Sequence, residues 1–518
     1  MRAASGPLVL LAALVGGLIV GERAAPVAAT GFLVVGVSVG VVAIVVGMQR
    51  DQLRSALALG VVALVMVGTT SMQRARHGLV SSPLAEAVAG YEPATIVVTL
   101  TEDPGGPTRF AVDATGRVHG AHRSVLVVAT GDAAGRTRVL SAGDQVTLVG
   151  SFRPLSGWER RARWRHAVGA FVATDLLDVA PPSSPLFAVA NQLRGLVVAG
   201  TARAPATERA LLAGLLLGDT RAIPSEMEEA FRSSGLTHHL AVSGENVAFV
   251  LVLAGPLLRR FGYRGRFLGG LVVIVVFGTM TRWEPSVLRA VTMTGCVMLA
   301  GLVGRPASGL RVLTIAAGGL LVADPFLIHS VGFGLSCAAT AGIALFAEPI
   351  SRRLRGPTLV GEALAVTLAA QIGVAPIMIP VFGSMPLASL PANVIAAPLM
   401  APITIGGLVA GIGGGLVAPV APGAARALVV PVTVLVRALE GAAVGCARIP
   451  FELGGVAAAL AAAGGLGAAG GRLAWRRSRR NGPTAGWPGS SSVGSKGDGD
   501  GGAGAGSDGD LGTASPRR

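Results

Sequence analysis

The chain has 518 residues, of which 51% are hydrophobic and 14% are charged, and its mean hydropathy is +0.64. This composition excludes an ordinary soluble globular protein, and its long apolar runs predict a polytopic α-helical membrane protein of about 11–12 spans. The formal net charge of +15 comes almost entirely from arginine, which suits cytoplasmic loops and also suits contact with nucleic acid.

Three apolar runs open the chain, at Pro7–Val20, Val27–Met48 and Ala56–Met72. Each approaches the length needed to cross a bilayer, so residues 1–80 are predicted to be N-terminal membrane spans. The arginines that flank these runs predict a cytoplasmic N-terminus, because cytoplasmic loops carry the excess of positive charge. An odd number of spans then places the following segment outside the cell membrane.

Residues 91–181 have a different pattern, in which short β-branched runs such as ATIVVTLT and RSVLVVAT are separated by Gly, Pro and Asp. Several short strands with turns at this spacing predict a small β barrel or sandwich. This segment has no cysteine, so a disulfide within it is excluded. The segment is predicted to be an extracytoplasmic domain.

A Trp- and Arg-rich stretch, RPLSGWERRARWRHAVG, lies within the β segment, with five arginines against a single glutamate, Glu159. Arginines bind phosphates and aromatic rings stack on unpaired bases, so this stretch is a candidate contact for single-stranded DNA. It could equally be a loop that rests on lipid headgroups, where Trp and Arg are common. The candidate DNA-contacting residues are Arg153, Trp158, Arg160, Arg161, Arg163, Trp164 and Arg165.

Residues 186–236 are apolar but interrupted by charges, which predicts amphipathic interfacial helices. Residues 237–472 return to long apolar runs and form a predicted membrane domain with both termini of the chain in the cytoplasm. Residues 481–518 are rich in Gly, Ser and Asp and are predicted to be a disordered cytoplasmic tail. The predicted spans of the membrane domain are 238–258, 267–281, 286–304, 310–323, 326–348, 359–381, 393–416, 427–447 and 453–470.

The stretch FRSSGLTHHLAVSGENVAF, at the start of this domain, carries a dense set of polar groups into apolar surroundings. If it is one helix, His239, Ser243 and Asn246 share a face, and Glu245 lies on the other side, one full heptad from His238. Ser243–Gly244 could instead break the helix and line a polar path, or these groups could merely satisfy one another.

Glu245, in the same stretch, needs a partner if it lies within a span. Arg289 is the predicted partner, because it enters its span at a similar depth, and Arg282 is the competing one. Gln371 and Asn393 are further polar groups within predicted spans. The prolines around them predict broken helices that line a pathway, and these are Pro376, Pro380, Pro391, Pro398 and Pro402.

Enzymatic functions find little support. The sequence has no P-loop, no H-E-x-x-H and no C-x-x-C, so neither a motor, a metal site nor any cofactor is predicted. An intramembrane serine hydrolase is disfavoured, because a serine and a histidine on adjacent turns of one helix are poorly placed to form a site. We therefore expect a protein that is not an enzyme, with its three cysteines as small core residues.

The segment GLLLGDTRAIPSEMEEAFRSSGLTHHLAVSGENVAFV resembles the opening signature of the competence domain of ComEC-type DNA-uptake proteins. PSVLRAVTMTG, ADPFLIHSVGFGLSCAATAGIALFA and AAQIGVAPIMIPVFGSMPLASLPANVIAAPL follow in the family's order, and the resemblance covers residues 1–470. The signature residues carried over by position are Gly235, Ser243, Gly244, Asn246, Arg289, Asp324, Pro325, Gln371, Pro391 and Asn393.

The resemblance implies an outward-facing OB-like β barrel and a cell-membrane channel that passes one strand of transforming DNA into the cytoplasm. Its implied partners are single-stranded DNA, membrane lipids and separate receptor, nuclease and motor proteins. Many relatives carry a C-terminal metallo-β-lactamase-like domain, and without an H-x-H-x-D-H motif this chain is expected to lack that nuclease. Glu245 stands where many relatives have an apolar residue. The alternative function is a transporter of a small or anionic solute.

Overall fold

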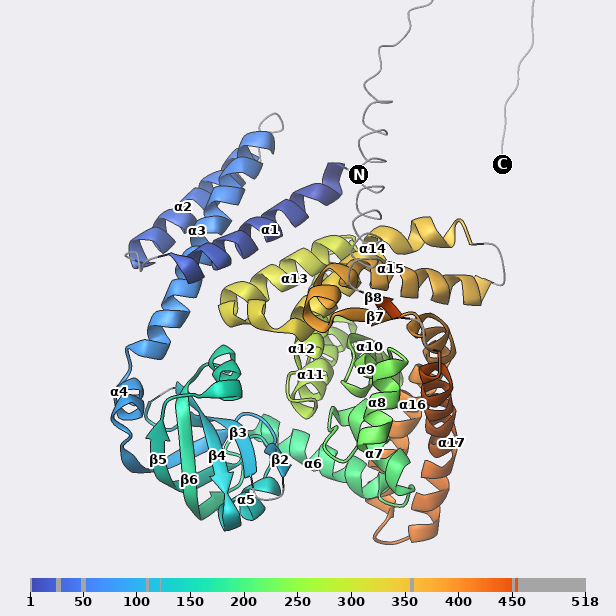
Figure 1. Ribbon diagram of the computed structural model, residues 1–518. Coiled ribbons are helices and arrows are strands. Elements are labelled where there is room, and N and C mark those ends of the chain that lie inside the picture. The colour runs from blue at the N-terminus through green and yellow to red at the C-terminus, as the bar shows by residue number, and fades with distance from the viewer. Residues whose placement is uncertain are drawn as a thin grey trace, which may run out of the picture. The chain divides into compact units, whose positions relative to one another are not determined.

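The computed structural model describes residues 2–24, 29–47, 53–108, 111–121, 123–354, 358–449 and 452–454. All of them lie in one compact unit, Met1–Gly465. Eight helices in these ranges are long and apolar enough to cross a membrane, and three shorter apolar helices accompany them. A small β barrel follows the N-terminal helices in the chain (Figure 1). The predicted polytopic membrane protein with an extra β domain is confirmed.

Three N-terminal helices form from the three apolar runs: α1 (Arg2–Arg23), α2 (Ala29–Gly47) and α3 (Leu53–Val80). Small residues let α1 and α3 approach closely. A Cβ added to Gly17 would lie 2.3 Å from the backbone oxygen of Val65 on α3. A side chain at this position would therefore push the two helices apart.

The β barrel follows α4 (Pro83–Gly90). β1 pairs with both β5 and β3, so the order β1-β5-β6-β4-β3 closes on itself, with β2 added beside β3. The β4–β6 pair is parallel and the other pairs are antiparallel. The elements are β1 (Pro93–Leu100), β2 (Gly105–Thr108), β3 (Ala111–Val118), β4 (Arg123–Thr130), α5 (Gly131–Arg138), β5 (Gln145–Arg153) and β6 (Ala167–Ala180).

This closed barrel of five strands has the OB-like character that the resemblance implied. Alternate residues of β1 and β5 point inward, and the ring of Phe152 packs edge-on against that of Phe171 at 4.9 Å. The β1–β3 loop contains Asp103, and the β5–β6 loop contains the 3-10 helix η1 (Gly157–Arg165). The corresponding loops of OB folds are the ones that bind oligonucleotides.

Four helices connect the barrel to the membrane domain: α6 (Pro185–Thr201), α7 (Ala206–Leu217), α8 (Ser225–Ser233) and α9 (Thr237–Leu240). α8 is amphipathic, with Phe231 fully buried. α7 differs from the predicted amphipathic helix, because Leu211, Leu212, Leu215 and Leu216 are all fully buried. It packs against both α16 and α17, so it has apolar neighbours on nearly every side.

The remaining helices form the membrane domain. Two predicted boundaries are wrong: the span 238–258 is interrupted at Ala241–Ser243, and the span 326–348 begins only at Val331. The elements are α10 (Gly244–Leu258), α11 (Tyr263–Met280), α12 (Pro285–Leu302), α13 (Gly309–Ala323), η2 (Pro325–His329), α14 (Val331–Ser351), α15 (Thr358–Phe382), β7 (Ser384–Pro386), α16 (Ser389–Val417), α17 (Pro422–Ala447) and β8 (Glu452–Gly454).

The end of the chain is only partly covered. β8 pairs with β7 where the span 453–470 was predicted to begin, and the rest of that span and the tail 481–518 lie outside the described residues. The predicted helix breaks at the prolines of α15 and α16 are wrong, because both helices run through them. The chain instead leaves the helix between them, at Gly383–Ala388.

Candidate functional site

A cavity of about 1030 Å³ lies between the barrel and the membrane domain. The barrel lines it with both of the loops defined above, through residues that include Asp103 and Arg161. The membrane domain lines it with the α11–α12 turn, η2 and the ends of α14 and α15. Segments far apart in the sequence therefore meet around one space, and this space is the candidate site.

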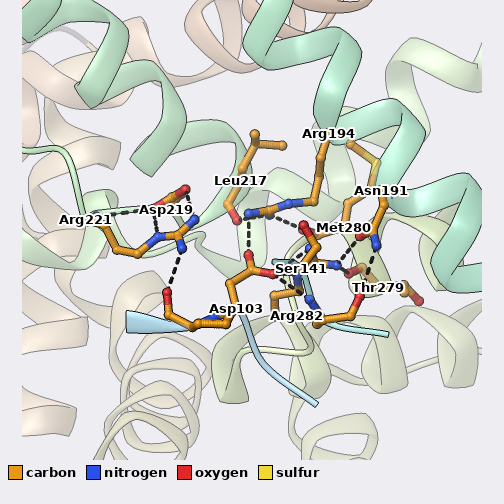
Figure 2. A network of polar contacts seen from close by, with 12 residues as sticks. Asp103, Ser141, Asn191, Arg194, Leu217, Asp219, Arg221, Thr279, Met280 and Arg282 are labelled. Atoms are coloured by element: carbon orange, nitrogen blue, oxygen red, sulfur yellow. Dashed lines mark hydrogen bonds and ion pairs between the residues drawn. The ribbon is translucent and has the colours of Figure 1, made fainter. Parts of the chain in front are cut away.

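Asp103 joins the two sides of the cavity (Figure 2). Its Oδ2 atom accepts a hydrogen bond from Arg194 Nη2 at 2.7 Å, and its Oδ1 atom accepts one from Arg282 Nε at 2.9 Å. The backbone N–H of Ala142 donates a third, also at 2.9 Å. The three charged side chains are only 10–11% exposed, so this is a buried ion cluster.

The charges of this cluster depend on one another. Burial alone would raise the pKa of Asp103, but the charges of Arg194 and Arg282 outweigh burial and the pKa is lowered. Burial lowers the pKa of Arg194 to about 10, against the opposing effect of Asp103. Asp103 and Arg194 are therefore both ionised at neutral pH. The cluster holds the β1–β3 loop against α6 and the α11–α12 turn.

The α11–α12 turn is strained, since Arg282 and Trp283 have φ values of 58° and 54°. A left-handed conformation costs a residue other than glycine about 1–2 kcal/mol. Contacts of both side chains maintain it: Arg282 Nη1 donates to Asn191 Oδ1 at 2.8 Å, and Trp283 packs against Gly278. Arg282 is thus engaged with the barrel side of the cavity and is not a partner of Glu245.

A second contact joins the β5–β6 loop to η2. The ring of Trp164 stacks on that of His329, with centroids 3.7 Å apart, and leans on Phe326 at 5.6 Å. His166 Nε2 lies 3.0 Å from Asp324 Oδ1. Trp164 and Asp324, predicted for DNA contact and for the channel respectively, here hold the barrel on the membrane domain.

The other residues of the Trp- and Arg-rich stretch divide into two groups. Arg153 forms a two-pronged pair with the buried Glu159, both bonds at 2.6 Å, and Arg165 pairs with Glu102. The rest are exposed and form no ion pair with any described residue. This exposed group, which the structure leaves available for a ligand, is Trp158, Arg160, Arg161 and Arg163.

In the membrane domain, several of the predicted polar residues form one network between α9 and α16. His239 Nε2 lies 3.3 Å from Asn393 Oδ1, and Asn393 Nδ2 donates to the backbone oxygen of Ser389 at 2.7 Å. The Ser389 hydroxyl accepts a hydrogen bond from Gln371 of α15. The network ties α9, α15 and α16 together at the point where α16 begins, with Pro391 in its first turn.

Asn246 and Ser243 belong to a separate group. Asn246 is fully buried, and its Nδ2 atom donates to the backbone oxygen of Leu215 on α7 at 3.0 Å. Its Oδ1 atom accepts from Ser243 at 3.5 Å and from Thr404 at 3.4 Å. The helix is interrupted before Ser243, which is the N-cap of α10. The predicted shared helix face with His239 is wrong, and the alternative of a local break at Ser243–Gly244 is confirmed.

The predicted ion pair between Glu245 and Arg289 does not form. Glu245 Oε1 lies 3.6 Å from His239 Nδ1, whereas Arg289 Nε donates to Ser336 Oγ on α14 at 2.8 Å. Gly244 lies against the guanidinium, and a Cβ there would be 2.7 Å from Arg289 Nη2. Glu245 is the next residue and points about 100° away around the helix. His238 is exposed and its ring lies beside that of His239, at 4.1 Å.

The part of the chain that the structure describes has no candidate metal site, since no group of three or more His, Cys, Asp or Glu side chains there could bind an ion. Cys296 and Cys337 are half-buried thiols and Cys446 is a buried one.

Glu284 faces the cavity at the N-cap of α12. Burial raises its pKa to about 7, although the charge of Arg194 lowers it somewhat. Its folded pKa therefore exceeds the ordinary value of 4.5, and ionisation weakens the fold as the pH rises from 4.5 to 7. This loss of folding stability is complete above pH 7.

We expect Glu284→Gln to stabilise the protein at pH 8 by about 2 kcal/mol, because the uncharged amide escapes this penalty. The gain should shrink as the pH falls and vanish near pH 4. Thermal unfolding of the purified protein across this range measures it. Glu229→Gln, on the exposed surface of α8, is the matched control. An equal gain at pH 8 and pH 4 would contradict the buried carboxylate.

Comparisons with known proteins place this site within a family signature. A family model described as "Competence protein" matches residues 215–477, which is half of the chain. The match includes the polar network and the membrane side of the cavity. No solved structure matches the chain.

Three curated proteins are similar. The "ComE operon protein 3" of Bacillus subtilis is 23% identical over 57% of this chain and 37% of its own length. The "Uncharacterized protein YcaI" of Escherichia coli is 28% identical, over 38% of this chain and 28% of its own length. An uncharacterized protein of Aquifex aeolicus is 31% identical, over 38% of this chain and 45% of its own length. The matches thus span less than half the length of each relative.

Proposed function

The chain belongs to the competence protein family, of the ComEC type, and from this membership we propose that it is a membrane channel for single-stranded transforming DNA. The observation that carries the proposal is the cavity. Both ligand-binding loops of an OB-like barrel line it, and so do the ends of the helices that match the family. A strand held by the barrel would lie at the entrance to the membrane domain.

The proposed orientation puts the barrel and the cavity outside the cell membrane and both termini in the cytoplasm. The α11–α12 turn and η2 lie at the cavity, whereas the connections at the opposite ends of the same helices are rich in arginine. Cytoplasmic loops carry such an excess of positive charge. The arginines concerned are Arg259, Arg260, Arg264, Arg266, Arg305, Arg311, Arg352 and Arg353.

In this proposal the exposed group of the β5–β6 loop receives the strand. Arginine side chains pair with phosphates, and Trp158, 62% exposed, offers a ring on which a base can stack. Arg161 also lines the cavity, so it would connect the loop to the entrance. The polar network around His239, Asn393 and Gln371 would then lie along the path.

We expect replacement of Arg160, Arg161 and Arg163 together by Gln to weaken binding of an oligonucleotide to the full-length protein. Each lost phosphate contact lowers the slope of log affinity against log salt by about 0.7 for a single strand, so the slope should fall by about two. Fluorescence anisotropy with labelled strands of 10 to 30 nucleotides, at several salt concentrations, measures both quantities. Arg136→Gln, an exposed arginine on α5 outside the cavity lining, is the control.

Binding that is independent of strand length and of these arginines would contradict the proposed DNA channel and favour the alternative, a transporter of a small anionic solute.

Trp164→Ala distinguishes the attachment of the β5–β6 loop to η2 from its contact with DNA. We expect this substitution to loosen the barrel from η2 and not to remove a base contact. A hydrolase is disfavoured further, since the Ser243 hydroxyl is bonded to Asn246 and not to a histidine. A separate receptor, nuclease and motor are proposed partners.

A further inference from the structure

Arg289 lies on α12 directly below the cavity. Pro285, four residues earlier, lines the cavity, and four residues make about one helical turn, so the two share a face. On α14, Val331 lines the cavity, and Ser336, which bonds to Arg289, follows it five residues later, about one and a half helical turns along the helix. The Arg289–Ser336 hydrogen bond therefore joins α12 to α14 just beneath the cavity.

Arg289 is a buried cation whose guanidinium contacts only neutral groups among the described residues. It is 8% exposed, and no carboxylate among the described residues pairs with it. Its Nε atom donates to a neutral hydroxyl, its Nη1 atom lies 3.1 Å from the sulfur of Met293, and its Nη2 atom donates to no described residue. An arginine stays protonated in proteins, and a buried charge without a partner is costly. This position therefore favours an anion.

The surroundings of Arg289 specify the class of anion. Its planar guanidinium matches a phosphate with two parallel hydrogen bonds. Its free edge lies against Gly244, the first residue of α10, where the partial positive charge of a helix N-terminus adds to the attraction. The nearest acid in the sequence of α10, Glu245, is turned toward His239. Glu245 therefore does not neutralise the guanidinium.

We propose that Arg289 binds the phosphates of the DNA strand as they pass from the cavity into the membrane domain. This inference rests on the proposed function and assigns one residue of the path. The Ser336 hydroxyl holds the guanidinium in place between phosphates. A carboxylate in its position would form a strong ion pair and would compete with the strand, whereas a hydroxyl is easily exchanged for a phosphate.

The test uses the full-length protein in a planar lipid bilayer, where a voltage drives a single-stranded oligonucleotide and each passage is counted as a current blockade. We expect Arg289→Gln to lower the passage rate by about tenfold or more, the effect of losing one charge-assisted contact. Arg289→Lys keeps the positive charge but loses the planar guanidinium that can form two parallel hydrogen bonds. Its passage rate should therefore lie between those of the original protein and Arg289→Gln. Thr292→Val is the control on the same helix: its hydroxyl bonds to the backbone oxygen of Leu288 and not to the guanidinium, so passage should stay within about twofold of the original protein.

Ser336→Asp makes the test independent of folding defects. It gives the buried guanidinium a carboxylate, so the protein should be at least as thermally stable, yet passage should fall by about tenfold because the guanidinium is occupied. Passage at the original rate through both Arg289→Gln and Ser336→Asp would overturn the inference while leaving the channel intact. Absence of passage through the unaltered protein would instead count against the proposed function.

Discussion

Asp103→Asn is expected to release the β barrel from the membrane helices. The substitution leaves Arg194 and Arg282 buried without the carboxylate that both contact. Removing one member of a buried ion cluster costs about 3–5 kcal/mol, because the remaining charge is uncompensated. The strained turn at Arg282 also loses its main contact. We therefore expect a lower Tm and proteolytic cleavage around the barrel at protease concentrations that leave the original protein intact.

Asp175→Asn is the matched control for this prediction. Asp175 lies on the same barrel and pairs with Arg136, but both side chains are more than half exposed. Exposed pairs contribute about 0–1 kcal/mol, so Tm and protease resistance should hardly change. Equal behaviour of the two variants would contradict the assignment of Asp103 as the contact that holds the barrel.

The effect of Asp103→Asn should also depend on pH. The folded pKa of Asp103 is lowered below its ordinary value of 3.8, so its carboxylate contributes stability that is complete above that value. This contribution is lost as the pH falls through the lowered pKa. The difference in Tm between Asp103→Asn and the original protein should accordingly be full at pH 7 and should disappear in strong acid.

The architecture could be predicted from the sequence because it follows from local patterns. Apolar runs of sufficient length gave the membrane helices, and short β-branched runs between turn residues gave the barrel. The cavity could not be predicted from the sequence, because its residues come together only through tertiary structure. Asp103 is 91 residues from Arg194 and 179 from Arg282, and in the sequence it belongs to an ordinary turn, EDPGGP. Its place in the β1–β3 loop of an OB-like barrel was the available signal.

The two largest errors in the site have a common physical origin. Treating residues 238–258 as one helix gave each side chain a direction that the break before Ser243 changes. Glu245 then points to His239, and Gly244 occupies the position beside Arg289. In the Trp- and Arg-rich stretch, composition alone did not separate Trp164, which packs on η2, from Trp158, which is exposed. Both distinctions depend on the packing of neighbouring elements.

Gly235→Ala is expected to disrupt the start of α16 and the polar network there. Gly235 has a φ of +74°, and an added Cβ would lie 2.4 Å from Ser389 Cβ and 3.2 Å from Ser389 Cα. The left-handed conformation costs alanine about 1–2 kcal/mol, and overpacking against the backbone adds about 1–3 kcal/mol. Because Ser389 bonds to both Gln371 and Asn393, its displacement should also separate Asn393 from His239.

Gly383→Ala isolates the steric part of this effect. Gly383 has a φ of +83°, but nothing lies within 4 Å of an added Cβ, so this variant carries only the conformational cost. Thermal unfolding of both variants should therefore show the larger loss for Gly235→Ala, by about 1–3 kcal/mol. In the proposed channel, passage of a DNA strand through a bilayer should fall for Gly235→Ala alone. If the two glycines lowered Tm equally, Ser389 would have moved aside without cost, and the network at α16 would not depend on the close approach of Gly235.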